Sequence, residues 1–295
     1  AASDVYKRQT FSFEKVPYGT WVIREIESPK GYVLSEEEIA VTIGKVDEVV
    51  EIELVNYFIK GNIALTKVDE DYPDNKLSGA VFEVYSDTNG DGKLDKDDTL
   101  LGEMKELDGG VYQMSELRYG KYLVKETKAP TGFVLDEDVY AVSIEENGKT
   151  YTVENKAGVG FINAAQKGSL KIVKTSSDGK VEGFSFRVTG VDYDQTFKTD
   201  KNGEIVIEGL RIGDYTVSEV SDKASAGYIL PADKQATVKV NATAIVQMHN
   251  EFRDTPKTGD DFNLGLWVSL AALSVVGAGV LGFVGYKNRK KKKED

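Results

Sequence analysis

The chain has 295 residues and a formal net charge of −12, and 40% of its residues are hydrophobic. The hydrophobic share is enough for packed cores and argues against a wholly disordered chain. The acidic balance argues against nucleic-acid binding, which needs a basic face to replace counterions. The chain has no cysteine and one histidine. This excludes disulfides, thiol catalysis and cysteine-bound metals, and a histidine-centred site is not expected.

The chain begins with a segment that we exclude from the fold. Residues 1–9, AASDVYKRQ, contain neither an initiator methionine nor the charged and apolar regions of a signal peptide. We interpret them as a sequence-assembly artefact and expect an export signal upstream. From residue 10 onward, segments rich in Val, Ile, Tyr, Phe and Thr alternate apolar with polar residues between Gly, Asn and Asp turns. This pattern predicts short β-strands and no soluble helix.

One sequence unit occurs three times in this region. Each copy has a glycine and, six positions later, a glutamate. The glutamates are Glu25, Glu126 and Glu219. Each copy then has a turn with a glycine and an aromatic residue, followed by a segment that we expect to form a strand carrying an asparagine. The asparagines are Asn56, Asn163 and Asn250. Such a period indicates tandem copies of one small fold.

The second and third copies begin with a strand that carries a lysine. Gly61 and Gly168 open these strands, and Lys67 and Lys174 follow six positions later. The first copy has no such strand, and we expect it upstream of residue 1. The spacing predicts β-sandwiches. We place the C-terminal part of a truncated domain at 10–60, a domain with an acidic insertion at 61–166, and a third domain at 167–252.

The alternation along the strands predicts which side chains are buried. Side chains of a strand point to opposite faces in turn, so Lys67 shares a face with the apolar Ile63 and Leu65. Glu126 likewise shares a face with Tyr122 and Val124. The same phase holds for the other members of the set, which are Glu25, Asn56, Asn163, Lys174, Glu219 and Asn250. Each unit therefore points its chemical groups toward its own core.

Burial of these groups favours a covalent reaction. Desolvation lowers the pKa of a lysine and raises that of a glutamate, so both can be neutral at pH 7. A neutral amine is a nucleophile, and a glutamic acid can polarise an amide and move a proton. We expect isopeptide bonds from Lys67 to Asn163, with Glu126, and from Lys174 to Asn250, with Glu219. The alternative is a buried lysine–glutamate salt bridge beside a structural asparagine.

The insertion in the second unit fits the spacing of an EF-hand loop. Its oxygen ligands would come from Asp87, Asn89, Asp91, the Lys93 carbonyl, Asp95 and Asp98. The predicted flanking elements are strands rather than helices, and the last ligand is Asp instead of Glu. We expect calcium here, although the isopeptide chemistry requires no cofactor. The alternative interpretation is a solvated acidic hairpin.

The C-terminal region carries three signals in order: a linker at 253–263, an uncharged stretch at 264–286 and a basic tail at 287–295. As a helix, the stretch is about 34 Å long and can span a bilayer core of roughly 30 Å. The tail is expected to stay in the cytoplasm, with the rest outside. The linker contains Thr255, Pro256, Lys257, Thr258 and Gly259.

This pentapeptide resembles the LPxTG sorting signal of Gram-positive surface proteins, with Thr255 in place of leucine. Together with the span and the tail, it predicts sortase cleavage between Thr258 and Gly259. The product would be joined to peptidoglycan or to another pilin subunit. The expected location is therefore the cell wall, after a transient stay at the membrane through the C-terminal helix.

A second resemblance covers the chain from about Thr10 to Phe252. The run YLVKETKAPTGF, from Tyr122 to Phe133, resembles the E-box of Gram-positive pilins, and the repeat resembles the Cna-B, prealbumin-like domain of SpaA-type pilins and collagen-adhesin stalks. The resemblance implies reversed-immunoglobulin sandwiches whose first and last strands lie side by side. The fold expected is thus all-β, with tandem Cna-B domains followed by one transmembrane helix. The third unit departs from the E-box after Glu219.

These signals predict a wall-anchored surface protein, either a pilin subunit or an adhesin stalk, that is a sortase substrate and not an enzyme. Host extracellular-matrix proteins are further expected partners. Two alternatives stay open. The region could anchor an exported enzyme whose catalytic domain lies upstream. The chain could also be a polymerising shaft pilin, although Asp74 stands where such pilins carry a lysine.

Overall fold

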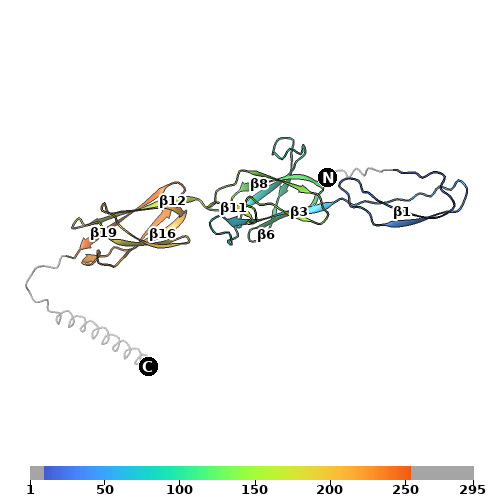
Figure 1. Cartoon of the computed structure of the whole chain (residues 1–295). Helices are drawn as coiled ribbons and strands as arrows, with labels where there is room; N and C mark the ends of the chain where they lie inside the picture. Colours follow the sequence, from blue (N-terminus) through green and yellow to red (C-terminus); the bar gives the residue numbers. More distant parts are fainter. Residues whose placement is uncertain (1–9, 254–295) are drawn as a thin grey trace, which may run out of the picture.

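The computed structural model describes residues 10–253, and β-strands are the regular elements of this range (Figure 1). The three units follow one another in a row. Within residues 10–253 there is no α-helix, so the all-β prediction is confirmed. The same range holds no helix long and apolar enough to cross a membrane. The predicted span at 264–286 and the basic tail at 287–295 lie outside the described residues.

The second unit is a sandwich of two sheets. One sheet has the order β10-β3-β7-β6, with β11 also paired to β3, and the other has the order β5-β4-β8-β9. The strands are β3 (Lys60–Asp69), β4 (Val81–Ser86), β5 (Thr99–Glu103), β6 (Lys105–Asp108), β7 (Val111–Arg118), β8 (Gly120–Lys128), β9 (Val139–Ile144), β10 (Thr150–Thr152) and β11 (Phe161–Asn163).

The third unit repeats this architecture with two four-stranded sheets, ordered β15-β12-β19-β17 and β14-β13-β16-β18. The strands are β12 (Lys167–Ser176), β13 (Ser185–Gly190), β14 (Tyr193–Lys198), β15 (Glu204–Arg211), β16 (Gly213–Val220), β17 (Tyr228–Ile229), β18 (Lys234–Val238) and β19 (Thr243–Phe252).

The first and last strands of both units lie side by side and run parallel, as the resemblance implied. In the second unit, β3 pairs with β11 and places Asn163 opposite Asp69. In the third unit, β12 pairs with β19 and places Asn250 opposite Ser176. In both cases the asparagine faces the residue two positions after the lysine. The same register therefore places the asparagine near the lysine in both units.

Within its described residues, 10–59, the first unit contains one strand pair, β1 (Gly19–Arg24) with β2 (Glu38–Ile43). Asn56 lies outside any strand, so the prediction of a strand through Asn56 is wrong. The physical reason is that a strand needs a hydrogen-bonded neighbour. In the other units that neighbour is the lysine strand, which has no counterpart in residues 10–59.

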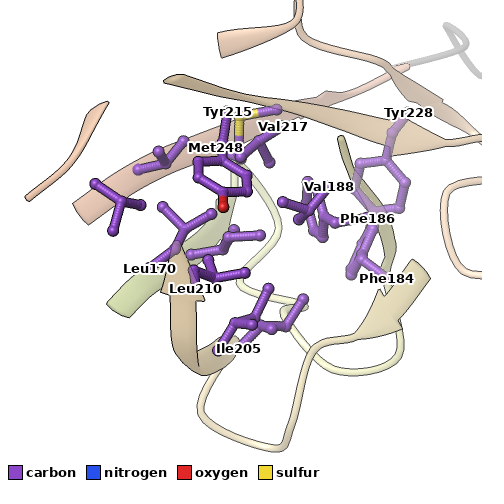
Figure 2. Close-up of a cluster of buried hydrophobic side chains, with 14 residues drawn as sticks. Leu170, Phe184, Phe186, Val188, Ile205, Leu210, Tyr215, Val217, Tyr228 and Met248 are labelled. Atoms are coloured by element: carbon purple, nitrogen blue, oxygen red, sulfur yellow. The ribbon is translucent and has the colours of Figure 1, made fainter. Parts of the chain in front are cut away.

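Both sandwiches have a dry core between their sheets. Figure 2 shows the third unit, where Phe186 and Tyr215 from one sheet meet Leu170, Leu210 and Met248 from the other. In the second unit, Phe161 makes edge-to-face contacts with Phe82 and Tyr140, with ring centres 5.0 and 5.1 Å apart. Burial of each large apolar side chain stabilises the fold by about 2 kcal/mol. The packed side chains also exclude water from the polar site described below.

The glycines that open the lysine strands are required by close packing. A β-carbon at Gly61 would lie 2.8 Å from the Lys149 carbonyl oxygen, and one at Gly168 would lie 2.2 Å from the Lys239 carbonyl oxygen. Both distances are shorter than any real contact. Only glycine lets the neighbouring backbone approach the start of the lysine strand at these two positions.

The same backbone joint connects each unit to the next. The Tyr119 N–H donates to the Ile59 carbonyl at 2.9 Å, and the Ile212 N–H donates to the Gln166 carbonyl at 3.1 Å. Ile59 and Gln166 stand at equivalent places, three residues after the asparagines of their units. Both joints therefore use main-chain atoms at matched positions.

An ion pair reinforces the second joint. Arg211 donates to both carboxylate oxygens of Asp69, at 2.6 and 2.8 Å, and to Asp71 at 3.0 Å. The guanidinium also lies 4.9 Å from the centre of the Tyr72 ring. The side chain of Asp69 is 3% exposed and that of Arg211 14%. This pair fastens the third unit to β3, the strand that carries Lys67.

Candidate functional site

In the second unit, the predicted lysine, glutamate and asparagine meet between the two sheets. Lys67 lies in β3 and Asn163 in the adjacent β11, whereas Glu126 lies in β8 of the opposite sheet. Their exposed fractions are 0% for Lys67, 0% for Glu126 and 3% for Asn163. The alternation of faces along each strand accounts for this burial.

Glu126 lies between the amine and the amide. Its two carboxylate oxygens accept hydrogen bonds from Asn163 Nδ2 at 3.0 and 2.9 Å. The Lys67 Nζ is 3.8 Å from Glu126 Oε1 and donates to the Phe161 carbonyl at 3.1 Å. It also lies 4.9 Å from the centre of the Phe161 ring. The carboxyl group can therefore exchange protons with both partners.

Burial moves both ionisable groups toward their neutral forms. Desolvation lowers the pKa of Lys67 to about 8, although the nearby carboxylates of Glu126 and Asp136 act in the opposite direction. Desolvation also raises the pKa of Glu126, against hydrogen bonds from Asp136 and Asn163 and the charge of Lys67. A neutral amine beside a protonated acid is the form that a dry site favours.

An unpartnered oxygen supports the acid form of the glutamate. Asn163 Oδ1 and Asn250 Oδ1 are buried without a hydrogen-bond donor, which is costly for a carbonyl oxygen. Rotating an amide by half a turn exchanges oxygen and nitrogen without changing its shape. In the second unit, that turn directs the carbonyl oxygen at Glu126. A protonated Glu126 would then donate to it and polarise the carbonyl carbon.

The third unit brings together the same three groups with a different lysine contact. Asn250 Nδ2 donates to Glu219 Oε1 at 2.7 Å. Lys174 is 1% exposed; its amine donates to the Thr175 carbonyl at 2.5 Å and lies 4.3 Å from the Phe184 ring centre. Burial lowers the pKa of Lys174 and raises that of Glu219. Glu219 itself is half-buried.

The first unit assembles only part of this set. Asn56 Nδ2 donates to Glu25 Oε2 at 2.6 Å and to the Val33 carbonyl at 3.1 Å. Both Glu25 and Asn56 are half-buried. Residues 10–59 supply no lysine to this pair, as the sequence led us to expect, so the described part of the unit contains no complete site.

Sequence reasoning missed the groups that hold Glu126 and Asn163 in place. The Asp136 N–H donates to Glu126 Oε2 at 2.9 Å, and its carboxylate accepts from Asn155 at 2.7 Å and Tyr140 at 2.8 Å. Asn155 also bonds the N–H and the carbonyl of Ile162 at 2.6 and 2.9 Å. The similarity of the runs 31–35 and 132–136 marks this segment in the sequence, but it does not reveal a backbone donor.

The acidic insertion forms a tight loop in which backbone N–H groups cap the carboxylates. Asp87 accepts from the Gly90 and Gly92 N–H groups at 2.7 and 3.1 Å. Asn89 Nδ2 donates to Asp95 Oδ2 at 3.2 Å, so these two predicted ligands bond each other. Within residues 10–253, no group of three or more His, Cys, Asp or Glu side chains is gathered so that it could hold a metal ion. Calcium binding therefore remains a prediction from the loop sequence, and the geometry of the loop does not support it.

The predicted sorting residues Thr255 to Gly259 lie outside the described residues, so sortase cleavage rests on the sequence.

All three units match one known domain family. The family model of the SpaA prealbumin-like fold domain matches residues 6–57, 61–157 and 168–252. The chain belongs to the SpaA prealbumin-like domain family. No curated protein sequence matches it.

Solved structures also match this SpaA-family chain. The TIE protein of Bacillus anthracis is 27% identical with a TM-score of 0.61, over 80% of this chain and 42% of that protein. The chain thus spans less than half the length of that relative. Two pilins match this chain at lower similarity. The minor pilin of Streptococcus agalactiae is 17% identical (TM-score 0.30, 68% of this chain, 99% of that one). The shaft pilin of Lactobacillus rhamnosus GG is 14% identical (TM-score 0.30, 65% and 98%).

Proposed function

We propose that the second and third domains form intramolecular Lys67–Asn163 and Lys174–Asn250 isopeptide bonds as they fold. The observation that carries this proposal is the position of Glu126 between the Lys67 amine and the Asn163 amide in a dry core. Each domain would be both substrate and catalyst, and the product would be a crosslinked structural module, not a turnover enzyme.

The reaction balances with the groups that are present. The neutral Lys67 amine attacks the Asn163 side-chain carbon, whose carbonyl oxygen accepts a hydrogen bond from protonated Glu126. The new carbon–nitrogen bond forms, the bond to the amide nitrogen breaks, and one ammonia leaves. Glu126 delivers its proton to the leaving nitrogen and takes the proton that the lysine nitrogen loses, so it ends as it began.

A salt bridge is the competing interpretation, and the observed geometry favours the covalent one. Charge pairing would be strongest with the amine in direct contact with the carboxylate, yet Lys67 Nζ is 3.8 Å from Glu126 and donates to a carbonyl instead. Both groups also have pKa values shifted toward neutrality. A charged pair would gain little here, because desolvation opposes it.

Intact mass spectrometry of the full chain tests the proposal. The wild type should lack two ammonia molecules relative to its sequence, and Glu126→Gln should lack one. Gln matches Glu in shape but cannot carry the proton, so its domain should fold without the bond. As a matched control, Glu106→Gln alters a carboxylate outside the site and should still lack two. An unmodified wild-type mass would leave the salt bridge as the correct interpretation.

The same proposal includes a role at the cell surface. The chain consists of domains like those of pilins and pilus adhesins, and its C-terminal sequence carries the sortase pattern. We infer a secreted, wall-anchored pilin subunit or adhesin stalk, held briefly at the membrane by the 264–286 helix. Its partners would be sortase, then peptidoglycan or another pilin subunit, with host extracellular-matrix proteins as candidate ligands. Crosslinked domains suit a stalk because they resist extension.

A further inference from the structure

The glutamates of the three units differ in one hydrogen bond. Glu126 Oε2 accepts the Asp136 N–H at 2.9 Å, and Glu25 Oε2 accepts the Ser35 N–H at 2.8 Å. Glu219 Oε2 is buried and has no hydrogen-bond partner. A buried carboxylate oxygen without a donor is costly, so the third unit must differ in whatever supplies this N–H.

A contact that recurs in all units aligns them and gives the residue of the third unit that is equivalent to Ser35 and Asp136. The aromatic residue of the glycine turn faces the residue two positions after the asparagine each time. The facing pairs are Tyr32 with Phe58, Phe133 with Ala165, and Tyr228 with Phe252. Three residues beyond these aromatics stand Ser35, Asp136 and Pro231. Proline has no N–H to donate, which explains the orphaned oxygen of Glu219.

We propose that the residue at this position sets the pH range over which each isopeptide bond forms, and that Pro231 extends the range of the third domain toward alkaline pH. This rests on the proposed function, in which the glutamate acts in its protonated form. A backbone N–H stabilises the carboxylate and not the acid, so it drives the glutamate toward the inactive form. One such bond lowers the pKa of a carboxyl by about one unit.

The other charged neighbours of the two glutamates match in kind. Glu219 faces Lys174 from β12 and Asp222 from the loop after β16, and it bonds Asn250 of β19. Glu126 faces Lys67 from β3 and Asp136. Each site thus has one lysine and one aspartate, and the two sites differ in the backbone donor, in the carbonyl that the lysine contacts and in the burial of the glutamate. Pro231 acts through Glu219 and is therefore a positioning residue. Because Glu219 is also less buried than Glu126, the effect of Pro231 is best measured by comparing variants of the third domain with one another.

The test follows bond formation after a pH jump in the full chain. Unreacted chain that has never folded, recovered from inclusion bodies in denaturant, is refolded at pH 5, where protonated lysines hold the reaction back, and then shifted to a series of values from pH 6 to 10. Samples are quenched in acid and digested, and mass spectrometry counts the crosslinked peptides of each domain separately. Folding thus precedes the measured step, and the second domain is an internal control for every change in the third.

Pro231→Ala should restore the N–H without adding a side-chain function. The alkaline limb of the third domain's rate profile should move to lower pH by about one unit, so its rate at pH 9 or above falls up to tenfold. The second domain should be unchanged. A change in packing alone would alter the yield and not the position of this limb. Coincident limbs for Pro231→Ala and the wild type would overturn the proposal.

The reverse exchange gives an independent measurement. Asp136→Pro should move the limb of the second domain to higher pH, whereas Asp136→Ala removes the carboxylate but keeps the N–H. A shift as large in Asp136→Ala as in Asp136→Pro would assign the effect to the side chain and overturn the proposal. If Asp136→Pro does not fold, Pro231→Ala decides alone. A wild type that loses no ammonia in either domain would instead refute the proposed function.

Discussion

Asn163→Ala removes the acceptor of the proposed second-domain bond and leaves Lys67 and Glu126 in place. The variant should lose two separate contributions to the free energy of unfolding. The first is the crosslink, which closes a loop of about 100 residues and contributes about 5 kcal/mol through the unfolded state. This contribution does not depend on pH, because the bond contains no titrating group.

The second contribution is the cost of a free amine in the core. The pKa of Lys67 in the folded domain is about 8, below the ordinary 10.5, so the folded state binds fewer protons than the unfolded state between these values. Stability of the variant therefore rises with pH through this window. The cost is absent above pH 10.5 and complete below pH 8, where it amounts to about 3 kcal/mol. A bonded lysine has no such titration.

Urea unfolding read by pulse proteolysis, with cleavage followed inside residues 61–166, measures both contributions. The difference in unfolding free energy between wild type and Asn163→Ala should be about 8 kcal/mol at pH 7 and about 5 kcal/mol at pH 10.5. Taking the difference removes the titration of groups common to both proteins. The double variant Lys67→Met/Asn163→Ala should still lack the contribution of the crosslink. Its difference in unfolding free energy from the wild type should not change with pH.

Two results would refute this reasoning. A difference that stays constant from pH 7 to 10.5 would mean that the Lys67 amine does not titrate in the core in the way its burial implies. A wild type whose own stability follows the Lys67 titration would mean that its amine is free, and hence that no bond forms.

Three further predictions concern other parts of the chain. Thr258→Ala should retain the protein in the membrane fraction and remove it from the wall, and unchanged wall attachment would exclude the sorting signal. Calcium should raise the thermal midpoint of the second domain in the wild type but not in Asp91→Ala; a wild-type midpoint unaffected by millimolar calcium would favour a solvated hairpin. Arg211→Ala should cost about 3 kcal/mol because it strands the buried Asp69, whereas Arg187→Ala, at an exposed pair, should cost under about 1 kcal/mol. Equal losses of stability in the two variants would contradict a stabilising role for the Arg211–Asp69 ion pair.

The sequence was sufficient to predict the core-facing lysine, glutamate and asparagine of the second domain. Period-2 alternation is a local property, and Ile63 and Leu65 report the buried face of β3 without any knowledge of the other sheet. The pairing of first and last strands came from the resemblance, since no local pattern states which strands become neighbours. The structure shows this pairing in both complete domains.

The details of the sites could not be read in the same way. The hydrogen bond from Asp136 to Glu126 uses a backbone atom, so residue type says nothing about it except where proline removes the donor. The amine of Lys174 bonds the Thr175 carbonyl, a choice among rotamers that alternation leaves open. The strand expected through Asn56 failed because pairing depends on a partner elsewhere in the chain.

The joint between units has a consequence for how such chains vary over evolution. Its hydrogen bonds join main-chain atoms at matched positions, Ile59 with Tyr119 and Gln166 with Ile212. Main-chain atoms are the same in every residue, so a copied unit meets its new neighbour without a set of co-adapted side chains. Gene duplication or loss of one unit would therefore preserve the joint and change only the number of modules. Pairs such as Arg211 with Asp69 can be added later, one joint at a time.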